Sequence, residues 1–150
     1  MKVRKLDSNE IPPMDLLLSA DPTKEHVEEY FRRGQCFIAE DKGQVIGVYV
    51  LLPTRSRTVE LVNIAVAKEK QGYGLGKQLV HHAIQIAKNE GYKTMEIGTG
   101  NSSIGQLALY QKSAFRITGI DRDFFIQHYY EEIFGKSIRC RDMIRLSQDL

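Results

Sequence analysis

Residues 58–80 read TVELVNIAVAKEKQGYGLGKQLV, and this stretch decides the fold. Its first part, residues 58–67, is rich in β-branched and apolar residues and predicts a strand. Three glycines then follow within five residues: Gly72, Gly74 and Gly76. From Leu75 onward apolar residues recur at helical spacing as far as Gly91, which predicts a helix. The stretch is therefore expected to form a strand, a glycine-rich turn and a helix.

A glycine-rich turn between a strand and a helix is typical of an anion site. Backbone N–H groups and the positive helix end attract phosphate there, and glycines let it approach the main chain closely. A P-loop would need glycine in place of Gln71 and serine or threonine in place of Gln78. A dinucleotide fingerprint would need glycine in place of Lys77. The spacing therefore argues against a nucleotide-dependent kinase or dehydrogenase.

Patterns on both sides of this stretch predict the remaining elements. Alternating or apolar runs predict strands over residues 2–6, 35–41, 44–52, 93–98, 115–120 and 139–146. Helical spacing predicts further helices over residues 21–33 and 104–113. Strands first, followed by strand–helix–strand–helix–strand, predict an α/β (α+β mixed) sheet with helices packed on it.

Composition narrows the class of protein. The chain has 150 residues, 42% of them hydrophobic, and a formal net charge of +2 without a concentrated basic stripe. We expect one domain over residues 1–150, no nucleic-acid partner and no membrane segment. Cys36 and Cys140 follow no signal-like segment and are expected to be reduced thiols in the cytoplasm. The pair His81 and His82 lacks a suitably spaced third ligand, so no metal is expected.

The pattern Gln71-x-x-Gly74-x-Gly76 after a hydrophobic strand resembles the GNAT superfamily of acetyl-coenzyme A-dependent N-acetyltransferases. The resemblance extends over ELVNIAV, QGYGLGKQLV, the strand at Glu96, the segment NSSIGQLALYQKSAF and the order of the N-terminal strands. It implies a mixed, mostly antiparallel sheet of about seven strands flanked by about four helices. It also implies acetyl-CoA as cosubstrate.

The resemblance carries a cofactor site onto particular residues. The strand before the turn would hold the pantetheine arm through Ile64, Ala65 and Val66. The turn would hold the pyrophosphate through Gln71, Gly72, Tyr73, Gly74, Leu75, Gly76 and Lys77. Asn101 would hydrogen-bond the coenzyme A arm. The alternatives are a plain glycine-rich turn and, for Asn101, an ordinary loop or N-cap residue.

Amine acetylation needs a neutral amine, stabilisation of an oxyanion and a proton for the departing thiolate. Glu60 and Glu96 match the positions of the general base in two branches of the family, although either could be a carboxylate on the outer face of a strand. Tyr110 matches a family tyrosine that protonates the thiolate. Helical spacing would place it on a polar face with Ser103 and Gln106, opposite Leu107 and Ala108. A backbone amide near Ile64 or Ala65 would stabilise the oxyanion.

The acceptor is indicated only by the least motif-like part of the chain. Residues 121–132 contain four acids, one arginine and four aromatics, which would suit a small cationic amine attacking acetyl-CoA directly. A surface helix with a buried aromatic side explains the same residues. A protein or peptide N-terminal acetyltransferase and a non-catalytic acyl-CoA-binding module are the alternative functions. A homodimer is compatible with all three.

Overall fold

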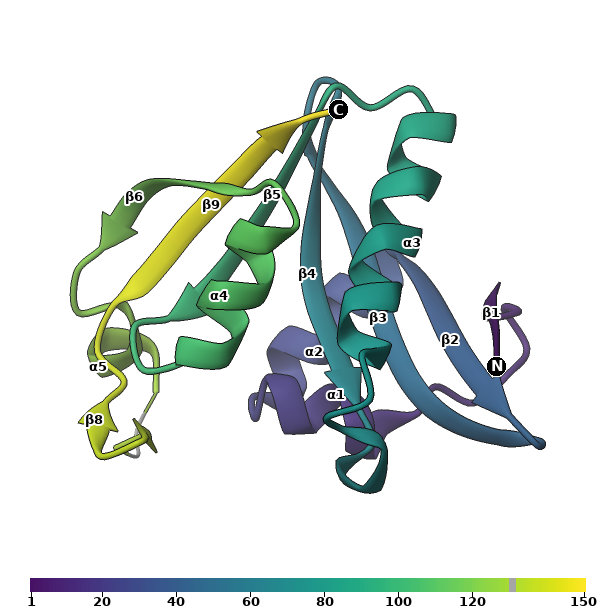
Figure 1. Ribbon diagram of the computed structural model, residues 1–150, viewed down its shortest axis with the longest axis horizontal. Coiled ribbons are helices and arrows are strands. Elements are labelled where there is room, and N and C mark those ends of the chain that lie inside the picture. Colours follow the sequence, from purple (N-terminus) through teal and green to yellow (C-terminus); the bar gives the residue numbers. More distant parts are fainter. Residues whose placement is uncertain (130–131) are drawn as a thin grey trace. The chain divides into compact units, whose positions relative to one another are not determined.

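The computed structural model describes residues 1–129 and 132–150, which form two compact units (Figure 1). The first unit comprises Met1–Met95 with Leu150, and the second comprises Glu96–Asp149. Seven strands form the main sheet, in the order β1-β2-β3-β4 through the first unit and β5-β9-β6 through the second. Each unit is described by itself below.

The first unit is built from an antiparallel sheet and three α-helices. Its elements are β1 (Lys2–Lys5), α1 (Met14–Ala20), α2 (Lys24–Arg33), β2 (Gln35–Asp41), β3 (Gln44–Arg55), β4 (Thr58–Val66), the 3-10 helix η1 (Lys68–Lys70) and α3 (Leu75–Asn89). Each strand pairs antiparallel with the next along the chain, from β1 to β4. Strand β5 (Thr94–Gly100) begins at the end of this unit.

Residues alternating along β3 serve opposite faces of this sheet. Val48 and Val50 pack in one apolar cluster with Leu17 of α1 and Val27 of α2. On the other face, a Cβ placed on Gly47 would lie 2.9 Å from Leu79 Cδ1 of α3, so this helix needs glycine there. Figure 1 shows α3 on one side of β3 and β4, and α1 and α2 on the other.

A β-bulge interrupts β4 in the middle of the strand that the sequence analysis singled out. Val50 of β3 pairs with Asn63 while Leu51 pairs with Leu61, so Val62 is an extra residue without a partner in this ladder. A bulge turns backbone groups out of the regular ladder and changes which face later side chains occupy. No residue type in residues 58–67 signals it.

Asn63 is a buried polar residue on the face of β4 that α1 and α2 cover. Its Nδ2 donates to Leu17 O over 3.0 Å and to the Tyr30 hydroxyl over 2.7 Å. The Tyr30 hydroxyl also lies 3.4 Å from Asp21 Oδ2. These bonds tie both helices to β4 and satisfy the two N–H groups of the buried Asn63 amide.

The second unit consists of a three-stranded part of the main sheet, two helices and a short ribbon. Its elements are β5, α4 (Ile104–Lys112), β6 (Arg116–Asp121), α5 (Phe124–His128), β7 (Phe134–Gly135), β8 (Ile138–Arg139) and β9 (Met143–Asp149). Strands β6 and β9 pair antiparallel, and so do β7 and β8. Buried side chains include Ile97, Tyr110, Phe115 and Leu146.

The expected fold class is confirmed, with corrections in detail. The described residues contain five α-helices: the residue patterns predicted α2, α3 and α4, α5 falls in the segment for which a surface helix was the alternative, and α1 was not predicted. The last strand begins at Met143, not near residue 139, since Arg139 pairs with Phe134 in the short ribbon. Helix α2 begins at Lys24, after Asp21 Oδ1 accepts a hydrogen bond from Thr23 N. Cys36 and Cys140 are both free and buried.

The segment proposed to select the acceptor is described only in part, because Tyr130 and Glu131 lie outside the described residues. No helix in the described part of the chain is long and apolar enough to cross a membrane.

Candidate active site

The turn before α3 has the backbone geometry of an open anion site. Gly72 has φ +87° and Gly74 has φ +81°, a conformation that residues with a Cβ rarely adopt. Gly74 is the N-cap of α3 and, because glycine has no side chain, no side-chain hydrogen bond caps the helix start. The first helical bond runs from Gln78 N to Gly74 O, so the N–H groups of the preceding first-turn residues have no helical acceptor. A Cβ built on either glycine meets no heavy atom within 4 Å.

The end of β4 is held directly against this turn. Ile64, Ala65 and Val66 are its last three residues, paired with β3. Gln71 Nε2 donates to Val66 O over 3.1 Å and so joins the turn to the strand. The sequence-predicted strand and turn residues therefore form one continuous, hydrogen-bonded segment.

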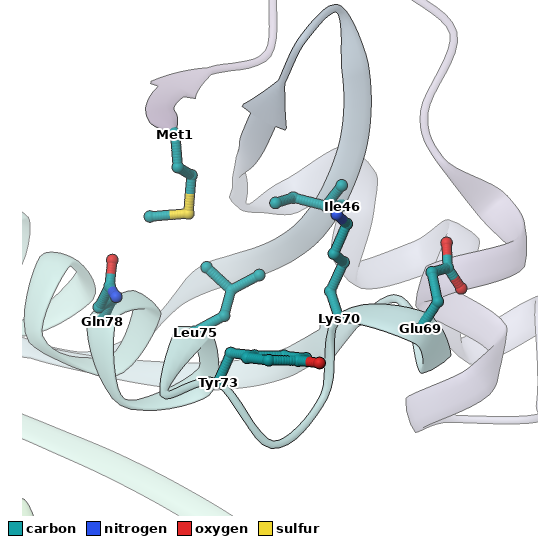
Figure 2. Close-up of a pocket in the computed structure, with 7 residues that line it drawn as sticks. All are labelled: Met1, Ile46, Glu69, Lys70, Tyr73, Leu75 and Gln78. Atoms are coloured by element: carbon teal, nitrogen blue, oxygen red, sulfur yellow. The ribbon is translucent and has the colours of Figure 1, made fainter.

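Beside the turn lies a pocket of about 340 Å³ (Figure 2). Its lining residues come from η1, the turn, α3, β3 and the N-terminus: Met1, Ile46, Glu69, Lys70, Tyr73, Leu75 and Gln78. Of the expected cofactor residues, Tyr73 and Leu75 contribute side chains to it, and the Tyr73 ring is 81% exposed. The contributions of Met1 and Ile46 were missed, because they come from distant parts of the sequence.

The donor set of the turn fits an anionic group. It combines backbone N–H groups at a helix start with the exposed ammonium of Lys77, and Lys68 and Lys70 follow β4 in η1. Helix N-termini favour negative charge, and lysine adds a positive one. A pyrophosphate is an anion that such a turn can hold.

Tyr110 lies on α4 in the second unit and is 4% exposed. Its ring packs edge to face on Phe115, with centroids 6.1 Å apart. Burial raises the pKa of its phenol to about 12. Within residues 1–129 and 132–150 its hydroxyl makes no hydrogen bond. The phenol therefore keeps its proton at neutral pH.

The expected faces of α4 need correction. Tyr110 was expected on a polar face opposite Leu107 and Ala108, but Ala108 and Gln106 are exposed while Tyr110 is buried. Ile104, expected on the apolar side, is also 43% exposed. Packing against Phe115 decides the orientation of the helix, which the local pattern does not encode.

Asn101 has a structural task that the sequence does not reveal. Its Oδ1 accepts from Arg141 N over 2.7 Å and from Asp142 N over 3.0 Å. Its Nδ2 donates to Arg139 O over 3.1 Å. These bonds fix the end of β5 to residues 139–142 and leave one amide hydrogen of Asn101 for a further acceptor.

The two candidate bases lie in different units. Glu60 is a half-buried residue of β4 opposite Leu52 of β3. Glu96 is a half-buried residue of β5 and the first residue of the second unit. The cofactor candidates before and within the turn belong to the first unit, and Tyr110 and Asn101 belong to the second.

One member of the histidine pair, His82, has a hydrogen-bond partner in the core. Tyr49, a fully buried residue of β3, places its hydroxyl 2.7 Å from His82 Nδ1. Desolvation lowers the pKa of His82, which keeps the imidazole neutral and able to accept from the phenol. Among the described residues, no three His, Cys, Asp or Glu side chains are grouped to hold a metal ion.

Comparisons with known proteins agree on one family. Residues 7–115 match the model of the acetyltransferase (GNAT) family. The chain is 60% identical over 136 residues to the uncharacterized N-acetyltransferase YvbK of Bacillus subtilis (strain 168), covering 91% of this chain and 88% of the relative.

Two solved structures are similar over nearly the whole chain. The IAA acetyltransferase of Bacillus cereus ATCC 14579 has a TM-score of 0.96 and 51% identity, covering 99% of both chains. A GNAT family acetyltransferase from Elizabethkingia anophelis with acetyl-CoA bound has a TM-score of 0.97 and 46% identity, covering 99% of this chain and 97% of that one. The chain is therefore an N-acetyltransferase that belongs to the acetyltransferase (GNAT) family and uses acetyl-CoA as its cosubstrate.

Proposed function

We propose that the protein transfers the acetyl group of acetyl-CoA directly to the primary amine of a small cationic molecule. The observation that carries the cofactor part is the uncapped start of α3 behind Gly72 and Gly74, whose backbone is open to an approaching anion. The Elizabethkingia anophelis relative, which has acetyl-CoA bound, supports the same assignment.

Each part of the cofactor is assigned to a stretch of main chain. The turn residues from Gln71 to Lys77 hold the pyrophosphate through their N–H groups and one ammonium. Residues Ile64, Ala65 and Val66, at the end of β4, hold the pantetheine arm. The bulge at Val62 supports a backbone N–H nearby as donor to the thioester oxygen, because bulge groups are not used by the β3–β4 ladder.

Acetyl-CoA supplies a thioester whose carbonyl carbon is attacked by the amine and whose thiolate leaves. Tyr110 protonates the leaving thiolate, since its raised pKa keeps the phenol protonated. Either Glu60 or Glu96 accepts the proton that the amine loses, because an alkylammonium of pKa near 10.4 is almost fully charged at pH 7.

The two carboxylates are separated by their pH profiles. If Glu60 is the base, Glu60→Gln lowers kcat/KM by about 10²-fold or more and removes the acidic limb of its pH profile. Glu96→Gln should then keep the wild-type kcat/KM and the acidic limb of its pH profile. The reverse pattern assigns the base to Glu96, and an intact acidic limb in both variants would contradict a carboxylate base.

The acidic and aromatic segment supports a cationic acceptor. Phe125 and Tyr129 lie together with ring centroids 5.3 Å apart, and cations bind well over such rings. Part of the acidic charge is already balanced within the second unit, because Asp121 pairs with Arg145 and Glu132 with Arg139. The aromatic rings and Asp123 therefore carry this part of the proposal.

An acceptor panel tests the substrate class. Polyamines, aminoglycosides, free amino acids, N-terminal peptides and IAA, named for the Bacillus cereus relative, are compared by thiol release and by mass spectrometry of the product. We expect turnover with small amines. Turnover only with N-terminal peptides, or only with IAA, contradicts the proposal. Cofactor binding with no turnover would indicate a non-catalytic acyl-CoA-binding module.

Action as one domain over residues 1–150 and a cytoplasmic location stay predictions.

A further inference from the structure

Among the residues that the structure describes, strand β6 ends the sheet of the second unit, with β9 as its one neighbour in the strand order (Figure 1). All six of its residues are exposed. An edge strand presents a row of backbone N–H and C=O groups that can pair with another strand. This edge can therefore accept an added strand.

A β-bulge in β6 changes which of its side chains share a face of the sheet. Ile117 pairs with Leu146 and Ile120 pairs with Ile144, while Thr118 is skipped between them. Leu146 and Ile144 are two residues apart on β9, so Ile117 and Ile120 share one face although they are three residues apart. Leu146 and Ile144 are buried, whereas Ile117 is 51% and Ile120 57% exposed. At its edge, the apolar face of this sheet thus exposes about half of the surface of Ile117 and Ile120 to solvent.

The opposite face of β6 carries opposite charges at its two ends. Arg116 pairs with Ser147 and Asp121 pairs with Met143, which lie on the face opposite to Leu146. Asp121 Oδ2 forms an ion pair with Arg145 Nη2 over 2.6 Å. Arg116 has no carboxylate partner within the described ranges, 1–129 and 132–150. The strand therefore carries at its start a guanidinium without a carboxylate partner in those ranges and, at its end, a carboxylate that is shared with Arg145.

These two faces make the strand complementary to itself. In an antiparallel pair, residues directly opposite each other point to the same face. When a regular strand pairs with its own copy about a two-fold axis, each residue can therefore lie opposite only a residue of the copy whose number differs from its own by an even number. The bulge at Thr118 permits the register in which Ile117 faces Ile120 and Arg116 faces Asp121. A shift of one residue would lose both matches.

We propose that β6 binds β6 of a second copy of this chain, antiparallel about a two-fold axis, so that the two sheets become continuous. Each interface then contains two Ile117–Ile120 contacts on one face and two Arg116–Asp121 ion pairs on the other. The contacts occur twice because a two-fold interface uses the same surface on both copies. Each Asp121 lies between Arg145 of its own chain and Arg116 of the second copy.

The proposed interface rests on one short strand, so the dimer should be weak. Stable interfaces usually bury about 1,200–2,000 Å² in total, which six paired residues on each side do not reach alone. We therefore expect a dissociation constant in the range of about 1 μM to 1 mM. Sedimentation equilibrium of the full chain across that range should show a reversible monomer–dimer equilibrium.

Charge exchange between two variants gives the sharpest test. Arg116→Glu places a carboxylate opposite Asp121, and Asp121→Lys places an ammonium opposite Arg116, so each variant alone should dimerise at least about tenfold more weakly. An equimolar mixture should regain wild-type association, because the new carboxylate of one variant then faces the new ammonium of the other. Ile117→Lys should abolish association, and Ile11→Lys, at a 90% exposed position of the first unit, is its matched control.

Circular dichroism and thermal unfolding confirm that each variant is folded. Recovery of the dimer in the mixture supports the β6–β6 register. A wild-type chain that stays monomeric to about 1 mM contradicts the proposal, as does a dimer that both charge variants and Ile117→Lys leave unchanged. Failure of the mixture to recover association also contradicts it.

Discussion

Tyr110 is a buried phenol of α4, and its proposed chemistry depends on its keeping a proton. With a pKa of about 12 caused by burial, it is protonated throughout the neutral range. Tyr110→Phe retains the ring that packs on Phe115 but removes the donor. We expect kcat to fall by about 10²-fold or more while KM for acetyl-CoA changes little.

Steady-state thiol release measures this effect, and Tyr92→Phe is the control for loss of a phenol elsewhere. Thermal unfolding of Tyr110→Phe should match that of the wild type. An unchanged kcat would exclude Tyr110 as the essential acid.

His82 links stability to pH through its contact with Tyr49. Because desolvation lowers its pKa in the folded chain, the unfolded chain binds the proton more readily. This stability is present above the unfolded pKa of about 6.5 and is lost as pH falls through the lower folded value. The melting temperature should therefore decrease below about pH 6.5.

Two neighbouring substitutions isolate this contribution. His82→Gln keeps an acceptor for the Tyr49 hydroxyl but cannot titrate, so its melting temperature should depend less on pH on the acid side. His81→Gln removes the adjacent exposed histidine and should leave the acid dependence as in the wild type. Equal pH profiles for the two variants would contradict the role of His82.

At the scale of elements, Asn63 joins β4 to the two helices on one face of its sheet. Asn63→Ala removes the hydrogen bonds that its amide donates to Leu17 O and the Tyr30 hydroxyl, while the contacts of these two groups with Asp21 remain. We expect the free energy of unfolding to fall by about 1–3 kcal/mol. Urea denaturation checks this against Asn89→Ala, at an exposed site in α3, for which a change below about 0.5 kcal/mol is expected. Equal losses would show that the Asn63 bonds do not hold the helices.

The turn before α3 can be tested against a matched glycine. Gly74 and Gly43 have φ +81° and +80°, and a Cβ on either meets nothing within 4 Å. Alanine at either site should cost about 1–2 kcal/mol of stability through backbone strain. Only Gly74→Ala should weaken coenzyme A binding, by about tenfold or more, because only its methyl group would approach the phosphates. Calorimetry that found equal affinities would contradict the anion site.

The sequence predicts the strand, turn and helix over residues 58–80 well because glycine conformation and apolar spacing are local properties. Helix α1 and the β7–β8 ribbon were missed, since distant partners stabilise them: Asn63 contacts Leu17, and Gly135 lies against Ser102. The candidate site shows the same division. Gln71 binds Val66 five residues away, whereas Asn101 binds the backbone about forty residues later.

At the scale of the whole molecule, the net charge of +2 conceals an uneven arrangement. Lys68, Lys70 and Lys77 belong to the first unit, close along the chain to the turn that fits an anion. The acidic and aromatic residues proposed for a cationic acceptor belong to the second unit. The family match over residues 7–115 includes residues of both units.

Direct acetyl transfer to a small amine is the central claim, and one measurement tests it most directly. The full chain is incubated with acetyl-CoA and a small amine that it turns over, and mass spectrometry quantifies the acetylated amine against the free thiol released. We predict equal amounts of the two products and no acetylated protein intermediate. Thiol release without acetylated amine, or an acetyl group carried on the chain, would contradict the account.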